Sequence, residues 1–154
     1  MAQALQMIMS GDAAVKARLQ GFPERLIPSL ISHLNTVNTQ LQRHIVSDKL
    51  SGQVLKSHTG NLKRNILQIA ATSEGTTVTA GVGLGQNARY GLTHEFGAVI
   101  VPKTAKALSW VGEDGVRVFA MRVKIPERSF LRTGFAEFKP NIVKAIQAAI
   151  QEAL

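Results

Sequence analysis

The stretch LIPSLISHLNTVNTQLQRHI, residues 26–45, has the clearest periodic pattern in the chain. Its apolar residues recur at every third or fourth position: Leu26, Leu30, Leu34, Val37, Leu41 and Ile45. This spacing places them on one stripe of an α-helix. The opposite face is polar: Ser32, Asn35, Asn38, Gln42 and Arg43. The pattern predicts a long helix over 25–47 that begins or bends at Pro28, with its stripe covered by a sheet or another subunit.

A second amphipathic helix is predicted at the end of the chain, over 132–154. Its apolar residues again follow helical spacing: Phe135, Phe138, Ile142, Ile146 and Ile150. At the other end, residues 1–24 form a separate N-terminal segment. Within it, Asp12 is expected to cap a helical turn over 13–19.

Residues 62–131 have the composition of a β-sheet region. The apolar run in 64–71 predicts a strand buried on both faces, and 76–83 alternates in the way that strands do, so the two are expected to form a hairpin. Further strands are predicted over 98–101, 107–111 and 116–125, with a tight turn over 112–115. A mobile loop is expected near 97–115.

These elements follow one another as helix, strands, loop, strands and helix. Consecutive strands joined by turns favour an antiparallel sheet. The sequence therefore predicts a single α+β domain over 1–154, in which an antiparallel β-sheet packs against the long N-terminal helix and the C-terminal helix.

The composition excludes several kinds of protein. Cys is absent, which rules out disulfides, thiolate zinc sites and a cysteine nucleophile. No apolar run approaches the roughly 20 residues that span a bilayer, so no membrane partner is expected. The first residues, MAQALQMIMSGD, lack a leading positive charge and do not resemble a signal peptide. We expect a soluble protein of a reducing cytoplasm.

The chain is basic, with 18 Lys and Arg against 10 Asp and Glu and a formal charge of +8. The charge is spread along the sequence, and its densest group is Arg117, Arg122, Lys124, Arg128 and Arg132. Two interpretations remain: a solvated basic surface, or attraction to phosphates or an acidic partner. The second keeps a small basic nucleic-acid-binding module as an alternative function.

No residue constellation in the sequence predicts catalysis. His94-Glu95 resembles the start of a zinc-protease motif, but Ala98 stands where the second His is required. The glycines of 81–85 are not followed by the Lys of a phosphate-binding loop. An enzyme from an unrecognised family stays open as a third reading, but we expect no catalytic residue, no metal and no cofactor.

Three short stretches are more specific because of their order. They are HTGNLKRNI at 58–66, YGLTHEFG at 90–97, and IPERSFLR at 125–132, which leads into the closing helix. Together they resemble the tail-component and head–tail joining (tail completion) proteins of long-tailed bacteriophages and the related virion morphogenesis proteins of Mu-like phages. Ser129 stands where the family pattern commonly has Pro, and residues 99–117 are difficult to align with it.

The resemblance implies a structural virion-assembly protein of a tailed phage or prophage and not an enzyme. Such proteins form a ring, commonly a hexamer, at the head–tail junction or tail end of the virion. The virion is assembled in the host bacterial cytoplasm. Their partners are copies of themselves, tail-tube or terminator proteins and head-connector proteins. DNA passes through the channel of the ring, where non-specific contact with it is expected.

Seven residues are candidates for the subunit interface or for the motifs themselves: Tyr90, Glu95, Phe96, Gly97, Trp110, Arg128 and Phe130. Glu95 and Arg128 are expected either to form an ion pair within the subunit or to act across a subunit boundary. The segment 99–111 is apolar and rich in β-formers, so it is expected to pair with a neighbour's sheet edge and to become ordered in a ring.

Overall fold

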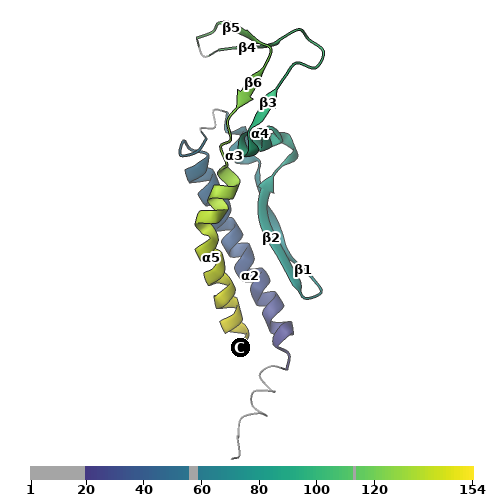
Figure 1. The fold of residues 1–154 in the computed structure, drawn as a ribbon. Helices are drawn as coiled ribbons and strands as arrows, with labels where there is room; N and C mark the ends of the chain where they lie inside the picture. Colours follow the sequence, from purple (N-terminus) through teal and green to yellow (C-terminus); the bar gives the residue numbers. More distant parts are fainter. Residues whose placement is uncertain (1–19, 56–58, 113) are drawn as a thin grey trace, which may run out of the picture. The chain divides into compact units, whose positions relative to one another are not determined.

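The computed structural model describes residues 20–55, 59–112 and 114–154 (Figure 1). The helical turn predicted over 13–19 lies outside these ranges, as do His58 and Glu113. The helical elements are α2 (Phe22–His44), a π-helical turn (Ile45–Lys49), α3 (Asn61–Arg64), a 3₁₀ turn (Gln86–Ala88), α4 (Tyr90–Phe96) and α5 (Phe130–Ala153). The strands are β1 (Ile66–Glu74), β2 (Thr77–Leu84), β3 (Ala98–Ile100), β4 (Leu108–Val111), β5 (Arg117–Ala120) and β6 (Val123–Ile125). The α+β class is confirmed.

The two long helices form where the apolar periodicity predicts them. α2 begins at Phe22, and Pro28 lies inside it instead of starting it. Its last turn continues as the π-helical turn, which carries the buried residues Ile45 and Lys49. α5 begins at Phe130, two residues earlier than predicted.

In the described residues the strands form three two-stranded sheets, β1–β2, β3–β6 and β4–β5, and not one continuous sheet. β3 and β6 are antiparallel, with Ala98 opposite Ile125, and so are β4 and β5, with Leu108 opposite Ala120. The single strand predicted over 116–125 is wrong, because Met121 and Arg122 interrupt it. Residues 98–125, which contain these two strand pairs, are called the arm below.

The first predicted strand also needs correction. Residues 61–64 form the short helix α3, and β1 begins only at Ile66. Ile66 is buried, but Leu67 and Ile69 are about half exposed, so the strand is not buried on both faces. The turn to β2 is made at Gly75, whose φ of 59° is readily adopted only by glycine. Because this connection is only two residues long, β1 and β2 are antiparallel.

The contacts divide the chain into two compact units. The first comprises residues 1–37, 70–80 and 140–154, and the second 38–69 and 81–139. In the described part of the first unit, α2 and α5 are joined by polar contacts near their ends. The Arg25 side chain donates to the carbonyl oxygen of Ala153 at 3.0 Å, and Glu152 contacts both Ser29 and His33.

The second unit contains the main apolar core. Eight buried residues form it: Leu41, Ile45, Leu50, Leu55, Leu62, Ile66, Ala88 and Phe130. α5 approaches the π-helical turn closely at Gly134, where an added Cβ would lie 2.8 Å from a side-chain carbon of Ile45. Phe130, at the start of α5, is wholly buried in this core, so its first role is to anchor the helix.

Two amide side chains on the polar face of α2, those of Asn38 and Gln42, are directed at the backbone of β1. Within the second unit, the amide of Asn38 donates to the carbonyl of Ile69 at 3.0 Å, and that of Gln42 to the carbonyl of Ile66 at 2.5 Å. These bonds satisfy carbonyl groups that a neighbouring strand would otherwise bind. They therefore close the edge of β1 that faces away from β2.

The amide of Asn38 provides a direct test of this edge closure. Asn38 is buried, so Asn38→Ala leaves the Ile69 carbonyl without its donor and is expected to lower the free energy of unfolding by about 1–3 kcal/mol. Urea denaturation followed by circular dichroism measures the change. Gln40→Ala, at an exposed position of the same helix, is the control and should be close to neutral. Equal stability of both variants would contradict the role of Asn38.

Candidate assembly surface

The three sequence motifs meet at one junction in the second unit. Gly91, in α4, lies so close to α3 and β2 that an added Cβ would be 2.8 Å from a methyl carbon of Leu62 and 3.0 Å from one of Leu84. The Asn61 amide lies 3.4 Å from the hydroxyl of Tyr90, which brings the first motif to the second. Glycine at position 91 therefore allows α3 and α4 to pack directly.

Glu95 joins the second motif to the third. Its carboxylate is only 1% exposed and accepts the backbone N–H groups of Leu131 and Arg132, each at 2.9 Å. These N–H groups belong to the first turn of α5, where they have no acceptor within the helix. Glu95 thus caps α5 from 36 residues away in sequence, and its negative charge is favourable at a helix N-terminus.

Of the two alternatives for Glu95 and Arg128, the ion pair within the subunit is not formed. The arginine that reaches Glu95 is Arg132, whose Nε lies 3.2 Å from the carboxylate. Arg128 contributes through its backbone, because its N–H donates to the carbonyl of His94 at 2.7 Å. Arg132 is the partner because it lies in the first turn of α5. Its backbone N–H and its side chain there both face the Glu95 carboxylate.

Arg132 organises the exposed side of this junction. Its Nη2 donates to the Glu95 carbonyl at 2.9 Å and to the Glu127 carboxylate at 2.6 Å. Its guanidinium carbon lies 4.8 Å from the centre of the Phe96 ring, which is the geometry of a cation–π contact. The hydrogen bond with Glu95, followed by that with Glu127, raises the pKa of Arg132 above its usual value.

Gly97 fixes the place where the arm leaves α4. Its φ is 69°, and an added Cβ would lie 3.0 Å from the backbone nitrogen of Glu127 and 3.2 Å from the carbonyl oxygen of Ile125. The outgoing and returning chains of the arm are thus in backbone contact at its base. A side chain at position 97 would separate them.

Replacing Glu95 tests this junction. Glu95→Ala leaves two N–H groups of the α5 start without their acceptor and is expected to lower the free energy of unfolding by about 2–3 kcal/mol. The measurement is chemical denaturation. Glu127→Ala removes only an exposed partner of Arg132 and should change stability by less than about 1 kcal/mol. A larger loss for the Glu127 variant than for the Glu95 variant would refute the capping role.

The arm exposes an unusual amount of apolar surface. Nine of its large apolar residues are exposed: Val99, Ile100, Val101, Trp110, Val111, Val116, Val118, Phe119 and Met121. In the β4–β5 register, Trp110 lies opposite Val118 and Phe119 opposite Ser109, so the two aromatic rings lie on opposite faces. Trp110 is 42% exposed and Phe119 65%, which leaves both faces of this strand pair uncovered.

A separate charged cluster joins the end of α2 to α5. Lys49 is 2% exposed, and its Nζ lies 2.5 Å from the Glu137 carboxylate. His44 lies between Glu137 at 3.2 Å and Asp48 at 2.8 Å. The hydrogen bond from Lys49 is the main reason why the pKa of Glu137 is lowered from its usual 4.5. The buried ammonium group is therefore compensated by a carboxylate that is ionised at neutral pH.

This cluster predicts a pH dependence. A carboxyl group whose pKa is lower in the folded than in the unfolded state stabilises the fold above its usual pKa, and this contribution is lost as the pH falls through the folded pKa. Glu137→Gln is therefore expected to be less stable at neutral pH and to lose less stability than wild type between about pH 5 and about pH 3. Urea midpoints across this range measure both slopes. Glu74→Gln, at the exposed end of β1, is the control that makes the same chemical change away from the cluster.

No group of three or more His, Cys, Asp or Glu in the described ranges is arranged to hold a metal ion. His94 is partly buried, and its Nδ1 has no hydrogen-bond partner among the described residues. Burial, followed by repulsion from Arg128, lowers the pKa of His94, which favours its neutral form. The ring of Tyr90 lies edge-on to it.

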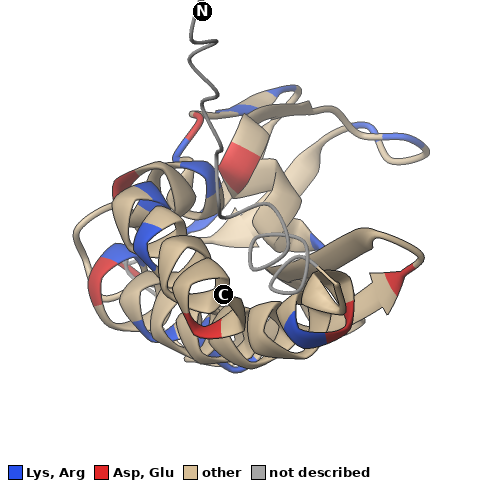
Figure 2. Cartoon of the chain, turned by 90° about the horizontal axis from the view of Figure 1, so that it is seen from below, with Lys and Arg blue, Asp and Glu red and all other residues tan. Residues whose placement is uncertain are grey.

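The basic residues are distributed over the helices, strands and turns instead of a single segment (Figure 2). None of the described helices is both long and apolar enough to span a membrane.

The structure sorts the predicted site residues into two sets. The junction contains Tyr90, Glu95, Gly97 and the backbone of Arg128. Trp110 instead lies exposed on the arm. Phe96 is exposed beneath Arg132. Sequence reasoning missed Arg132 as the partner of Glu95 and Phe119 as an exposed residue. The signal for Arg132 was its position in the first turn of the closing helix.

Comparison of the chain with protein-family models, with curated proteins and with solved structures finds no match.

Proposed function

We propose that this chain is a structural virion-assembly protein of a tailed bacteriophage or prophage. In this proposal, copies of the chain form a ring at the head–tail junction or tail end, which completes the tail and joins it to the head. The ordered motifs of the sequence suggest the class of protein. The apolar arm is the observation that carries the proposal, because it supplies a surface suited to self-association.

The amount of exposed surface supports association. Trp110 and Phe119 are aromatic side chains of the kind that bury roughly 150–250 Å² each in an interface. Seven further large apolar residues of the arm are exposed beside them. A two-stranded hairpin with both faces uncovered is also marginally stable alone, so a covering partner would stabilise the arm.

The junction supports the same proposal by its position in the chain. The arm leaves α4 at Gly97 and returns to α5 through residues 126–129. Glu95 and the bond between Arg128 and His94 hold these two ends together. An apolar arm whose base is fixed in this way can present its surface to a neighbour in one orientation, as a closed ring requires.

Native mass spectrometry tests the self-association. The wild-type protein is expected to form one discrete higher oligomer in the absence of DNA, and this oligomer should persist at high salt because its contacts are mainly apolar. The variant Arg117→Gln/Arg122→Gln, which removes two cations from the arm, is expected to keep the oligomer. A monomer that changes mass only on addition of duplex DNA, with a steep loss at high salt, would instead support the nucleic-acid-binding alternative.

The role in the virion is tested with phage. A phage lacking this protein is expected to accumulate separate heads and tails, visible by negative-stain microscopy. Infectious particles with joined heads and tails in its absence would refute the proposal.

A further inference from the structure

One edge of β2 has no strand partner among the described residues. Among the described residues, β2 pairs only with β1, while the other edge of β1 is closed by Asn38 and Gln42. β2 has the sequence TVTAGVGL, with no charged residue and no proline. Exposed strand edges are usually protected by charges, proline or bulges. This edge has neither charge nor proline, so its free N–H and C=O groups remain available to another strand.

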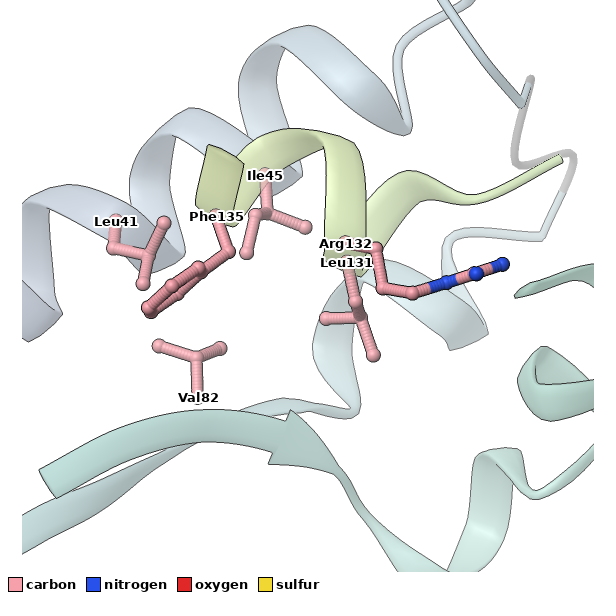
Figure 3. Close-up of a pocket in the computed structure, with 6 residues that line it drawn as sticks. All are labelled: Leu41, Ile45, Val82, Leu131, Arg132 and Phe135. Atoms are coloured by element: carbon pink, nitrogen blue, oxygen red, sulfur yellow. The ribbon is translucent and has the colours of Figure 1, made fainter. Parts of the chain in front are cut away.

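Both faces beside this edge can receive side chains. On one face, Val82 lines a mainly apolar pocket of about 290 Å³ together with Leu41, Ile45, Leu131, Phe135 and Arg132 (Figure 3). A cavity of about 150 Å³ already accommodates benzene, so this pocket has room for an aromatic side chain. On the opposite face, Gly81 and Gly83 carry no side chains, and a methyl carbon of Ile69 would lie 3.8 Å and 3.6 Å from Cβ atoms added there.

The arm has one strand that fits this acceptor. β4, with the sequence LSWV, is uncharged and pairs only with β5 among the described residues, whereas β5 carries Arg117 and β6 carries Lys124. Leu108 and Trp110 lie on one face of β4, and Ser109 and Val111 on the other. In one of the two orientations in which β4 can lie beside β2, Trp110 is on the pocket face and Ser109 and Val111 are on the glycine face.

We propose that β4 of one copy adds to the free edge of β2 of a second copy, with Trp110 entering the pocket beside Val82. This inference rests on the proposed function, because it assigns the two surfaces through which the copies associate. The occupant is a second copy because the same chain carries both the uncovered β4 strand with its exposed Trp110 and the open β2 edge beside the pocket. Donor and acceptor differ, so the contact is heterologous and generates a ring when its rotation closes.

Two single variants separate the donor from the acceptor. Trp110→Ala removes the side chain that enters the pocket. Gly81→Lys places a charge beside the β2 edge, and the site accepts a Cβ because the nearest atom, a methyl carbon of Ile69, would lie at 3.8 Å. Each variant alone is expected to be monomeric at a concentration where wild type forms rings. Gly81→Ala and Phe119→Ala are the controls, and both should retain oligomers, since Phe119 lies on β5 and on the opposite face of the arm.

Mixing the two variants gives the decisive result. Trp110→Ala keeps an intact β2 edge and Gly81→Lys keeps an intact arm, so an equimolar mixture should form 1:1 heterodimers that cannot extend further. Native mass spectrometry with one isotope-labelled variant detects them. Circular dichroism first establishes that each variant is folded, and Thr79→Lys replaces Gly81→Lys if the latter unfolds.

The remaining outcomes are distinguishable. If wild type forms rings but the mixture gives no heterodimer, or if Gly81→Lys and Thr79→Lys still form rings, the β4–β2 contact is refuted and the proposed function stands. If Phe119→Ala abolishes assembly as completely as Trp110→Ala, the arm associates through both faces and the strand addition is likewise refuted. If wild type is monomeric under all conditions, the proposed function itself fails.

Discussion

The carboxylate of Glu95 is the group on which the base of the arm depends. A buried charge is tolerated only when its hydrogen-bonding capacity is satisfied, and the first turn of a helix offers N–H groups that need an acceptor. Glu95 and the start of α5 meet these needs reciprocally, with two N–H bonds of 2.9 Å. Because the arm lies between α4 and α5 in the chain, the same bonds hold its two ends together. A single interaction thus stabilises a helix start and defines where the exposed strands begin.

The sequence predicts the parts of this protein that depend on local periodicity. The stripe from Leu26 to Ile45 and the spacing of the closing helix give α2 and α5, and the alternation after Thr76 gives β2. The break at Met121 was not predicted because 116–125 is uniformly rich in β-formers. The composition therefore does not show that the first part of this segment pairs with β4 and the last part with β3. Likewise, the half-exposed side chains of Leu67 and Ile69 contradict a pattern that resembles a buried strand.

The partner of Glu95 shows a different limit. Sequence order places Arg128 and Arg132 equally well near Glu95, and only the path of the chain into α5 decides between them. The amides of α2 were more predictable. Asn38 and Gln42 stand where a solvated helix face usually carries Lys or Glu, and amides both donate and accept hydrogen bonds. Their position on one face was a signal that this face meets a backbone edge, which the structure shows to be β1.

The hydrogen bonding of the strand edges indicates which surfaces remain for assembly. The edge of β1 is closed by side chains of the same subunit, and the N–H groups of the α5 start are capped by Glu95. The outer edge of β2 has no strand partner among the described residues, and the apolar arm lies uncovered. An apolar surface of this size and an open strand edge are both costly in solution, and their chemistry is complementary. A chain that retains both is suited to neighbours of its own kind, because each copy brings the donor and the acceptor of the same contact.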